Sequence, residues 1–585
     1  MFGKILGIDE DTIRVINKSK KAEISMIGIH VVFLGDVIKY VGVVKNVTED
    51  YIDIDLIGEI KNNNFTAGII KKPNVESSCR IISKQELETI LGHQDYTKAN
   101  SLLIGNSEIY DNFKITVDED DFFTSHFAIV GNTGSGKSCG MARLLQNLFF
   151  LNDRLVPKNA HFVIFDAFND YSTSFAPMNN HPSLSYKNLV CDFDDNSYKE
   201  NVKIPAYFLD VDDLAILLDV SDPTLIPAIT NTLRIAYIFT SSDTAALRYK
   251  NSIIASSILD ILSSGKNPTQ VRDQIIAVLT KFNTPELNLD SIISQPGYNR
   301  TLRQCLLIDN QGKINAINLV VDFVSEFITK NLENMETQKD FIYTLDDLYD
   351  ALEFSLINEG ILSANNLFDK LNSLKVRLRA IMDSDIKKIF EFDKVITKEE
   401  FVKKFFMNGE KHAQIVGVNF GNLDDRTVKM LTKILSRIFF QYVVSLEDRT
   451  TFPIHIIIEE AHRYVQNDSD VKVLGYNIFE RITKEGRKYG IFLGIITQRP
   501  TELSNTVLSQ CGNFIAFKMY FLDDINVVTS LSTSVTEELK KKLKLLHPGM
   551  ALCFGNSFRL PLVVQFELPD PMPVSTNVDI IKMWY

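Results

Sequence analysis

The sequence predicts an α/β fold whose central sheet is parallel, with a small β-barrel before it and a helical insertion inside it. Three short apolar runs, at 126–130, 162–166 and 454–458, have the pattern of buried strands. A helical pattern over 141–151 separates the first two runs. Strand, helix and strand in succession form the βαβ unit of a parallel sheet, so these runs place a doubly covered sheet in the middle of the chain.

A glycine-rich segment joins the first apolar run to its helix. It has the pattern G-x-x-x-x-G-K-[ST], in which glycines let backbone N–H groups converge on phosphate oxygens at a helix N-terminus. We expect Lys137 to reach the β- and γ-phosphates and Ser138 to offer its hydroxyl to Mg²⁺. A chance glycine-rich turn is the alternative. The predicted nucleotide-binding residues are Gly131, Asn132, Thr133, Gly134, Ser135, Gly136, Lys137, Ser138 and Cys139.

Two adjacent acids follow the apolar run at 454–458. Beside a phosphate loop, one strand-end carboxylate can hold Mg²⁺ and the next can polarise the water that attacks the γ-phosphate. We assign Glu459 to the metal ion and Glu460 to the water, although the usual first acid is Asp and both acids could simply be solvated. Asp166 ends another run, where it either approaches the nucleotide or caps a loop.

Polar residues precede and follow a further apolar run, at 491–496. Thr497 and Gln498 at its end would lie beside the γ-phosphate and sense the nucleotide state. Arg487, just before the run, could enter a neighbouring subunit's site as an arginine finger, although exposed arginines are common. The predicted catalytic residues are therefore Glu460, Arg487 and Gln498, and the predicted metal ligands are Ser138 and Glu459.

Length and pattern divide the chain into several parts. A chain of 585 residues is too long for one core, so two to four domains are expected. Closely spaced strand patterns begin the chain, and amphipathic segments such as 226–239, 245–262 and 364–381 follow the first part of the sheet. The predicted parts are a β-barrel (1–95), a first core segment opening with a polar connector at 96–125 (96–205), a helical insertion (206–405), a second core segment (406–555) and a C-terminal strap (556–585).

Composition narrows the class of protein. A hydrophobic content of 45% is that of an ordinary globular chain, and the formal net charge of −12 argues against non-specific coating of nucleic acid. Local positive charge can still form a nucleic-acid channel. The six cysteines lack C-x-x-C spacing, which indicates reduced thiols and no zinc site. The start lacks an apolar core and no apolar run is long enough to cross a membrane, so we expect a cytoplasmic protein without a membrane partner.

Together these motifs resemble the HerA family of bacterial and archaeal hexameric ATPases, relatives of the FtsK-type DNA translocases. The similarity covers about 100–205 and 405–565 well and the first part loosely. The segments that carry it are 126–138, Glu459-Glu460-Ala461-His462-Arg463, Glu485-Gly486-Arg487-Lys488-Tyr489-Gly490, Thr497-Gln498-Arg499-Pro500 and Leu508-Ser509-Gln510-Cys511.

The resemblance implies a RecA-like core behind a HAS-barrel-like module, in a homo-hexameric ring with ATP and Mg²⁺ at subunit interfaces. It also implies double-stranded DNA in the pore and a partner effector, either a nuclease or a sirtuin-like NAD hydrolase, in DNA-end processing or antiphage defence. The family's trans-acting arginine corresponds best to Arg487, with Lys488 and Arg499 as rivals. The alternative function is a ring scaffold, switched by ATP, that activates its partner without substantial movement along DNA.

Overall fold

The chain folds into two compact units in the computed structural model. Unit 1 consists of Met1–Asp192, Glu399–Asn467 and Ile478–Tyr585, and unit 2 of Phe193–Lys398 and Asp468–Asn477. The residues that the structure describes are 2–18, 26–35, 37–98, 100–111, 113–151, 154–191, 200–241, 244–329, 341–362, 365–392, 394–421, 423–466, 470–532, 534–574 and 583–584.

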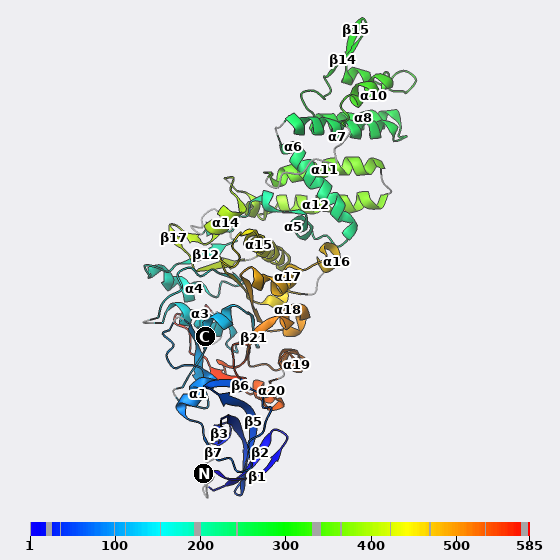
Figure 1. Ribbon diagram of the computed structural model, residues 1–585. Coiled ribbons are helices and arrows are strands. Elements are labelled where there is room, and N and C mark those ends of the chain that lie inside the picture. Colours follow the sequence, from blue (N-terminus) through cyan, green and yellow to red (C-terminus); the bar gives the residue numbers. More distant parts are fainter. Residues whose placement is uncertain are drawn as a thin grey trace. The chain divides into compact units, whose positions relative to one another are not determined.

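Unit 1 begins with an antiparallel sheet in the order β1-β2-β5-β4-β3-β7, to which β6 adds by pairing with β5 (Figure 1, blue). The sheet curls so that Cα atoms of β1 and β7 approach within 8 Å, which gives a barrel-like module. Helix α1 follows, with a capping box between Ser83 and Glu86. The elements are β1 (Phe2–Asp9), β2 (Thr12–Asn17), β3 (His30–Leu34), β4 (Lys39–Val47), β5 (Tyr51–Lys61), β6 (Asn64–Ala67), β7 (Cys79–Ile81) and α1 (Lys84–Leu91).

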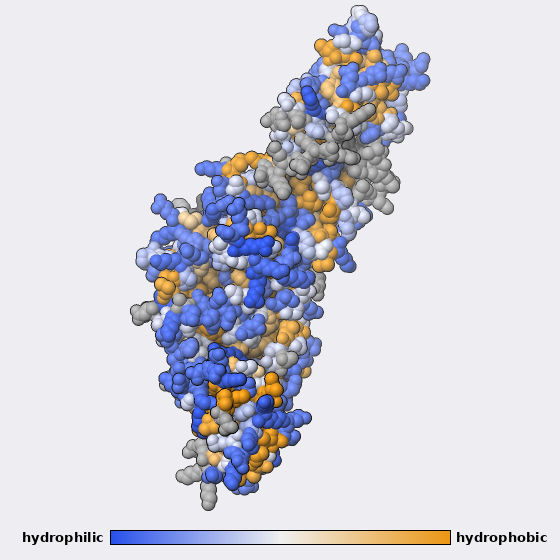
Figure 2. Space-filling model, viewed as in Figure 1, coloured by the Kyte–Doolittle hydropathy of each residue, from blue (hydrophilic) through white to orange (hydrophobic). Residues whose placement is uncertain are grey.

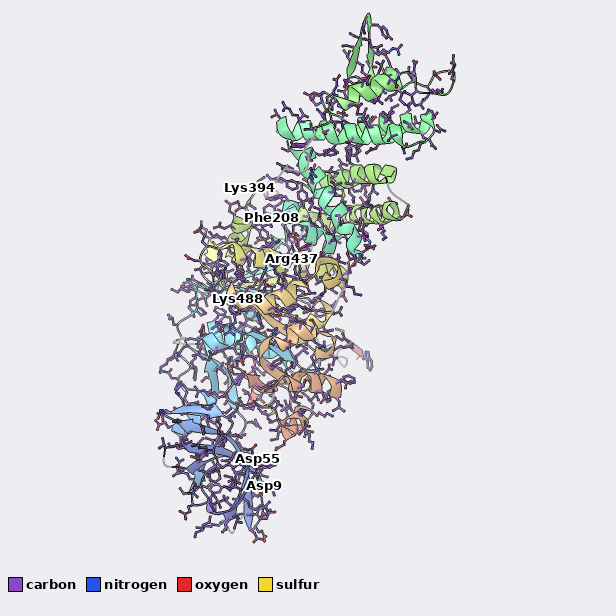
Figure 3. All side chains as sticks on the ribbon, turned by 45° about the vertical axis from the view of Figure 1, so that its right-hand side comes forward. Asp9, Asp55, Phe208, Lys394, Arg437 and Lys488 are labelled. Carbon is purple, nitrogen blue, oxygen red and sulfur yellow. The ribbon has the colours of Figure 1, made fainter. Side chains whose placement is uncertain are left out.

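Buried and partly exposed residues alternate along β5, which explains the apolar interior and the polar outer face of this module. Ile52 and Ile54 are fully buried inside the curl, because successive side chains of a strand point to opposite faces. Between and after them, Asp53 and Asp55 point outward and bind cross-strand partners: Arg14 donates to Asp53, and the Thr12 hydroxyl donates to Asp55 at 2.7 Å. Figure 3 labels Asp55 on this sheet. The outer acids thus keep one face of the strand in water.

The main sheet of unit 1 runs in the order β12-β18-β11-β19-β20-β10-β21-β22-β23-β8-β9. It is parallel from β12 to β21 and antiparallel from β21 to β9. The strands are β8 (Ser101–Ser107), β9 (Lys114–Asp118), β10 (His126–Val130), β11 (Phe162–Asp166), β12 (Tyr186–Val190), β18 (Ile415–Asn419), β19 (Ile454–Ile458), β20 (Ile491–Thr497), β21 (Cys511–Phe517), β22 (Met550–Gly555) and β23 (Leu562–Gln565).

Helices complete unit 1, with a short hairpin of β16 (Met407–Asn408) and β17 (Lys411–His412). Every residue of β10, β11, β19 and β20 is buried, as expected for parallel strands covered on both faces. The helices are α2 (Glu119–Phe123), α3 (Lys137–Phe149), α4 (Ser172–Phe175), η2 (Ala176–Asn180), α14 (Lys398–Phe405), α15 (Asp425–Ser445), η6 (Ala461–Arg463), α17 (Ile478–Glu485), η7 (Gly486–Lys488), η8 (Pro500–Glu502), α18 (Asn505–Ser509), α19 (Leu522–Ser530) and α20 (Glu537–Leu543).

The predicted fold class is confirmed. The order β11-β19-β20-β10-β21 places the phosphate-loop strand β10 beside β20, which in turn lies beside the acid-bearing strand β19. Because these strands are parallel, the carboxyl ends of β10, β19 and β20 share one edge of the sheet. This is a RecA-like α/β core, preceded by the curled antiparallel sheet and interrupted by helices.

The expected polar connector at 96–125 is wrong. This segment contains strands β8 and β9 and helix α2, and β8 pairs with both β9 and β23. Leu102 and Ile104 are fully buried in the core of unit 1. The short apolar run 102–104 is typical of a strand, but the polar residues around it hide the alternation of apolar and polar residues that would have indicated one.

The C-terminal segment belongs largely to unit 1. Strand β23 is part of the main sheet, so the strap expected from 556 onward includes a core strand. Beyond it, Glu567 binds Arg143 and Lys114, and the Gln146 side chain donates to the Pro571 carbonyl at 2.9 Å. The described residues 566–574 therefore pack on their own chain, across the helix that follows the phosphate loop.

Unit 2 is largely helical and has its own apolar core (Figure 1, green). Helix α11 packs on α6, α7 and α12. Among the described residues of the whole chain, no helix is long and apolar enough to cross a membrane. The face of the molecule seen in Figure 2 is mostly hydrophilic, with scattered apolar patches. The elements are β13 (Glu200–Asn201), η3 (Ala206–Phe208), α5 (Val211–Leu217), η4 (Pro223–Leu225), α6 (Ile226–Thr240), α7 (Thr244–Ser263), α8 (Pro268–Lys281), β14 (Ile292–Gln295), β15 (Tyr298–Thr301), α9 (Leu302–Cys305), α10 (Ile317–Ser325), α11 (Leu345–Leu362), α12 (Asn365–Met382), α13 (Lys387–Phe390) and α16 (Asp470–Leu474).

Candidate nucleotide-binding site

The glycine-rich loop follows β10 and is fixed to its neighbours by backbone hydrogen bonds. The N–H of Gly131 donates to the Thr497 carbonyl at 3.3 Å, and the N–H of Asn132 donates to the Lys518 carbonyl at 2.9 Å. Gly136 caps α3 with φ at +111°, a conformation that side chains disfavour, and a Cβ there would meet the Gly549 backbone at 3.1 Å. Glycine is therefore required where the loop turns into the helix.

Two side chains of the loop are poised for an anion. The buried Lys137 ammonium donates to the Asn132 carbonyl at 3.1 Å, which folds the lysine back over the loop. The Ser135 hydroxyl is buried and has no hydrogen-bond partner among the described residues. Together with the free N–H groups of the first turn of α3, they form a cradle that fits phosphate oxygens.

Glu459 lies directly against the helix that begins at Lys137. The Ser138 hydroxyl donates to one Glu459 oxygen at 2.8 Å, although the two residues are 321 positions apart in the sequence. The Tyr171 hydroxyl donates to the other oxygen at 2.9 Å. Glu459 is only 3% exposed, so both of its carboxylate oxygens are held in a buried position.

Glu460, the second acid, is linked through Gln498 to the end of β20 and to the phosphate loop. Its backbone is left-handed, with φ at 49°, which is strained for a side-chain-bearing residue and is characteristic of functional sites. The Gln498 amide donates to one Glu460 oxygen, and Gln498 in turn accepts from the Thr133 hydroxyl. The second Glu460 oxygen is buried and has no hydrogen-bond partner in the described chain.

Burial shifts the pKa values of the charged groups here. It lowers the pKa of Lys137, an effect opposed by the charges of Glu460 and Glu459. It raises the pKa of Glu459 to about 8, although the hydrogen bonds from Ser138 and Tyr171 act in the opposite direction. The pKa of Asp170 rises to about 6, through burial first and then the charges of Asp166 and Glu460. Burial thus disfavours the ionised carboxylates, and a bound cation would stabilise them.

The loop after β11 contains residues that the sequence pattern did not indicate. Asp166 caps this loop, because its carboxylate accepts from the N–H groups of Phe168, Asp170 and Tyr171 at 3.0 to 3.3 Å. The loop carries Tyr171 to Glu459. Asp166 at the end of the strand was the one signal in the sequence. It indicated a loop, but it did not indicate that Tyr171 would enter the site. His462 is a further addition, since its ring approaches Thr497 at 3.2 Å.

Arg487 does not join this group of residues. It is exposed on η7, before the amino end of β20, and its charge acts on His126 at the amino end of β10. The length of β20 separates it from the phosphate-loop edge by roughly 20 Å. Lys488 beside it is also exposed (labelled in Figure 3). Arg499 lies at the carboxyl end of β20, where it donates to Glu502 at 2.7 Å.

Nucleotide and Mg²⁺ fit the residues present. Within the described parts of the chain, no cluster of three or more His, Cys, Asp or Glu could hold a metal ion. Mg²⁺ at phosphate sites needs few protein ligands, because phosphates and waters supply the rest. Ser138 and Glu459 meet that need, and Cys139 lies half-buried in the first turn of α3. The fold and the site define a P-loop nucleotide-binding protein with a RecA-like core.

Comparison with known proteins finds similarity to HerA helicases. Residues 102–320 match the family model described as "Helicase HerA, central domain", which extends from the first core segment into the helical unit. A "Probable DNA double-strand break repair helicase HerA" of Methanocaldococcus jannaschii is 21% identical over 93% of this chain and 91% of that protein. Over most of its length the chain is similar to HerA proteins.

Other matches are more partial. The HerA helicase of Pyrococcus furiosus is 21% identical over 88% of this chain and 76% of that protein. The match to the HerA helicase of Sulfurisphaera tokodaii, at 26% identity, spans 47% of this chain and 58% of that protein, which is under two thirds of its length. The solved bacterial conjugative coupling protein TrwB covers 84% of this chain at 11% identity, with a TM-score of 0.42, too low to bear on the assignment.

Proposed function

We propose that the chain is the ATP-hydrolysing subunit of a HerA-type motor that moves double-stranded DNA. The observation that carries this proposal is the meeting of Ser138 and Glu459 at 2.8 Å, with Glu460 next to them. Hydrolysis of a γ-phosphate requires a phosphate cradle, a metal-binding acid and a second acid that can accept a proton. Here one oxygen of that second acid, Glu460, accepts no hydrogen bond among the described residues and lies 3.4 Å from the His462 ring.

Each residue has a distinct role in this proposal. The loop N–H groups and Lys137 bind the phosphates, while Ser138 and Glu459 hold Mg²⁺, which supplies positive charge to the phosphate oxygens. Glu460 accepts a proton from the attacking water and orients it, and Gln498 holds Glu460 in place while contacting the loop through Thr133. Catalysis is then mainly positioning and electrostatic stabilisation.

An arginine from a second copy completes the site in this proposal. Arg487 lies at the amino edge of the sheet, roughly 20 Å along β20 from its own phosphate loop. If it stabilises the transition state, it does so in a neighbouring subunit. This supports a ring, and the HerA resemblance favours six subunits.

The names of the relatives support a proposal for the cellular role. Several of them are named as DNA double-strand break repair helicases, which supports DNA-end processing, and antiphage defence is the other candidate. The partner we propose is an effector, either a nuclease or a sirtuin-like NAD hydrolase, working with the ring in the cytoplasm.

A ring scaffold switched by ATP is the competing function. The formal net charge of −12 favours it. The densest basic cluster of the sequence is Lys540, Lys541, Lys542 and Lys544, and two of its members are paired with acids of the same helix: Lys540 binds Glu537 and Lys542 binds Glu538. In that case ATP binding would assemble the ring and activate a partner with little movement along DNA.

The first test is ATP turnover by the Lys137→Ala variant. Loss of the ammonium should reduce turnover by about 100-fold or more while the thermal unfolding midpoint stays near that of the wild type. The control is Lys4→Ala, an exposed lysine on β1, which should turn ATP over normally. Undiminished hydrolysis by Lys137→Ala would refute the assignment of the loop.

A second measurement separates motor from scaffold. ATP turnover is followed with and without duplex DNA, over a series of salt concentrations. Stimulation by DNA that falls steeply with salt supports the motor, because phosphate contacts release counterions. Stimulation only by a partner protein, with no response to DNA, supports the scaffold instead.

A further inference from the structure

Tyr171 is a buried residue whose hydroxyl points at the acid assigned to the metal ion. The residue is 0% exposed, and its hydroxyl donates to Oε2 of Glu459 at 2.9 Å. Oε1 of the same carboxylate accepts from Ser138. The two oxygens therefore have separate donors, one on the helix after the phosphate loop and one on the loop after β11.

The position of the phenol is fixed from several sides. The Tyr171 N–H donates to Asp166 at 3.0 Å, and its ring stacks on Phe175 with 6.1 Å between centroids. The C-terminal segment holds the same loop, because the N–H of Val574 donates to the Asp170 carbonyl at 2.8 Å. A tyrosine held in this way presents its hydroxyl at one point.

Glu459 needs such a restraint more than an aspartate would. Its side chain has one more rotatable bond, so the carboxylate can swing through a wider arc unless a neighbour fixes it. Oε1 of Glu459 accepts from the Ser138 hydroxyl, which is the hydroxyl expected to bind Mg²⁺. The hydroxyl of Tyr171 holds the other oxygen, and so leaves the first one aimed at that position.

We propose that Tyr171 is a positioning residue that holds the Glu459 carboxylate in the orientation that accepts Mg²⁺ with bound nucleotide. The inference rests on the proposed ATP site and adds a residue from the loop after β11 to it. Residues of this kind around metal ligands change metal affinity or activity by about 10- to 100-fold when they are altered.

The test is the affinity of ADP, measured by fluorescence of a labelled ADP with Mg²⁺ and with a chelator. In Tyr171→Phe the gain in affinity that Mg²⁺ provides should shrink by about 10-fold, while the affinity in chelator stays unchanged. The matched control is Tyr186→Phe. Tyr186 is also buried and in contact with Phe175, but its hydroxyl has no hydrogen-bond partner among the described residues.

A second variant pair asks whether Tyr171 acts through Glu459. In a Glu459→Gln background, Tyr171→Phe should change the Mg²⁺-dependent gain by less than about 2-fold, because the carboxylate it orients is absent. An unchanged gain in Tyr171→Phe alone would overturn the inference and leave the nucleotide site intact. A wild-type chain that fails to bind ADP would instead overturn the proposed function, and the inference with it.

Discussion

Glu86 shows how one residue can tie a local motif to the stability of a module. Its carboxylate accepts from Arg80 and Lys39 at 2.7 to 2.8 Å and from the N–H of Ser83, within the capping box of α1. Burial raises its pKa, but the hydrogen bonds from Arg80 and then Lys39 outweigh it and hold the pKa well below its usual range. The ionised form therefore stabilises the folded state.

This gives a pH-dependent prediction. Because the folded-state pKa lies below the unfolded value of about 4.3, the contribution is fully present above that pH and is lost as the pH falls through the folded-state pKa. Glu86→Gln should destabilise the protein by about 1–3 kcal/mol at pH 7, measured by calorimetric unfolding. The control is Glu88→Gln on the same helix. An equal loss at pH 7 and at pH 2 would contradict the ionic origin.

Single residues of the nucleotide site were partly predictable. A motif fixes which residue types meet a phosphate, so the roles given to Lys137 and Ser138 stay close to what the sequence indicates. The partnership of Ser138 with Glu459 followed from the motifs together. Tyr171 could not be predicted, because a tyrosine five positions after a strand-end acid has no distinctive pattern, and its importance comes from the course of the loop.

At the scale of elements, long helices and fully buried strands were easier to predict than short strands with polar ends. Helical periodicity over 226–239 and 245–262 matches α6 (Ile226–Thr240) and α7 (Thr244–Ser263) within two residues at each end. The strands β8 and β9 and the hairpin β14–β15 are short and polar at their ends, so their period of two is not visible against the surrounding residues. The pairing of β8 also depends on the distant strand β23.

The segment η7 and strand β20 carry the next prediction. Arg487 precedes β20 and Gln498 follows it. The same segment can therefore place Gln498 in the site of its own subunit and Arg487 in the site of a neighbouring subunit. The Arg487→Ala variant should bind ATP normally and hydrolyse it about 1,000-fold more slowly.

Mixing two inactive variants tests whether the arginine acts between subunits. A mixture of Lys137→Ala and Arg487→Ala chains should hydrolyse ATP faster than either alone, since some interfaces pair an intact loop with an intact arginine. Lys488→Ala serves as the comparison and should hydrolyse ATP at near-normal rates. Normal turnover by Arg487→Ala would transfer the role to Lys488 or Arg499.

At the scale of the whole molecule, the sequence could indicate the parts but not their order in the sheet. The resemblance to HerA proteins predicted a RecA-like core, and the structure confirms it. The placement of β20 between β10 and β19 depends on packing between segments hundreds of residues apart, which periodicity does not encode. The five-part division of the chain stays a prediction.

The account depends on Glu460 acting on water beside the phosphate loop. The measurement that tests this most directly is single-turnover hydrolysis of ATP by the Glu460→Gln chain, with Glu502→Gln, an exposed acid near Arg499, as the control. We predict that the variant binds ATP with Mg²⁺ as the wild type does and hydrolyses it about 100-fold more slowly or worse. Hydrolysis within a few-fold of the wild-type rate would contradict the account.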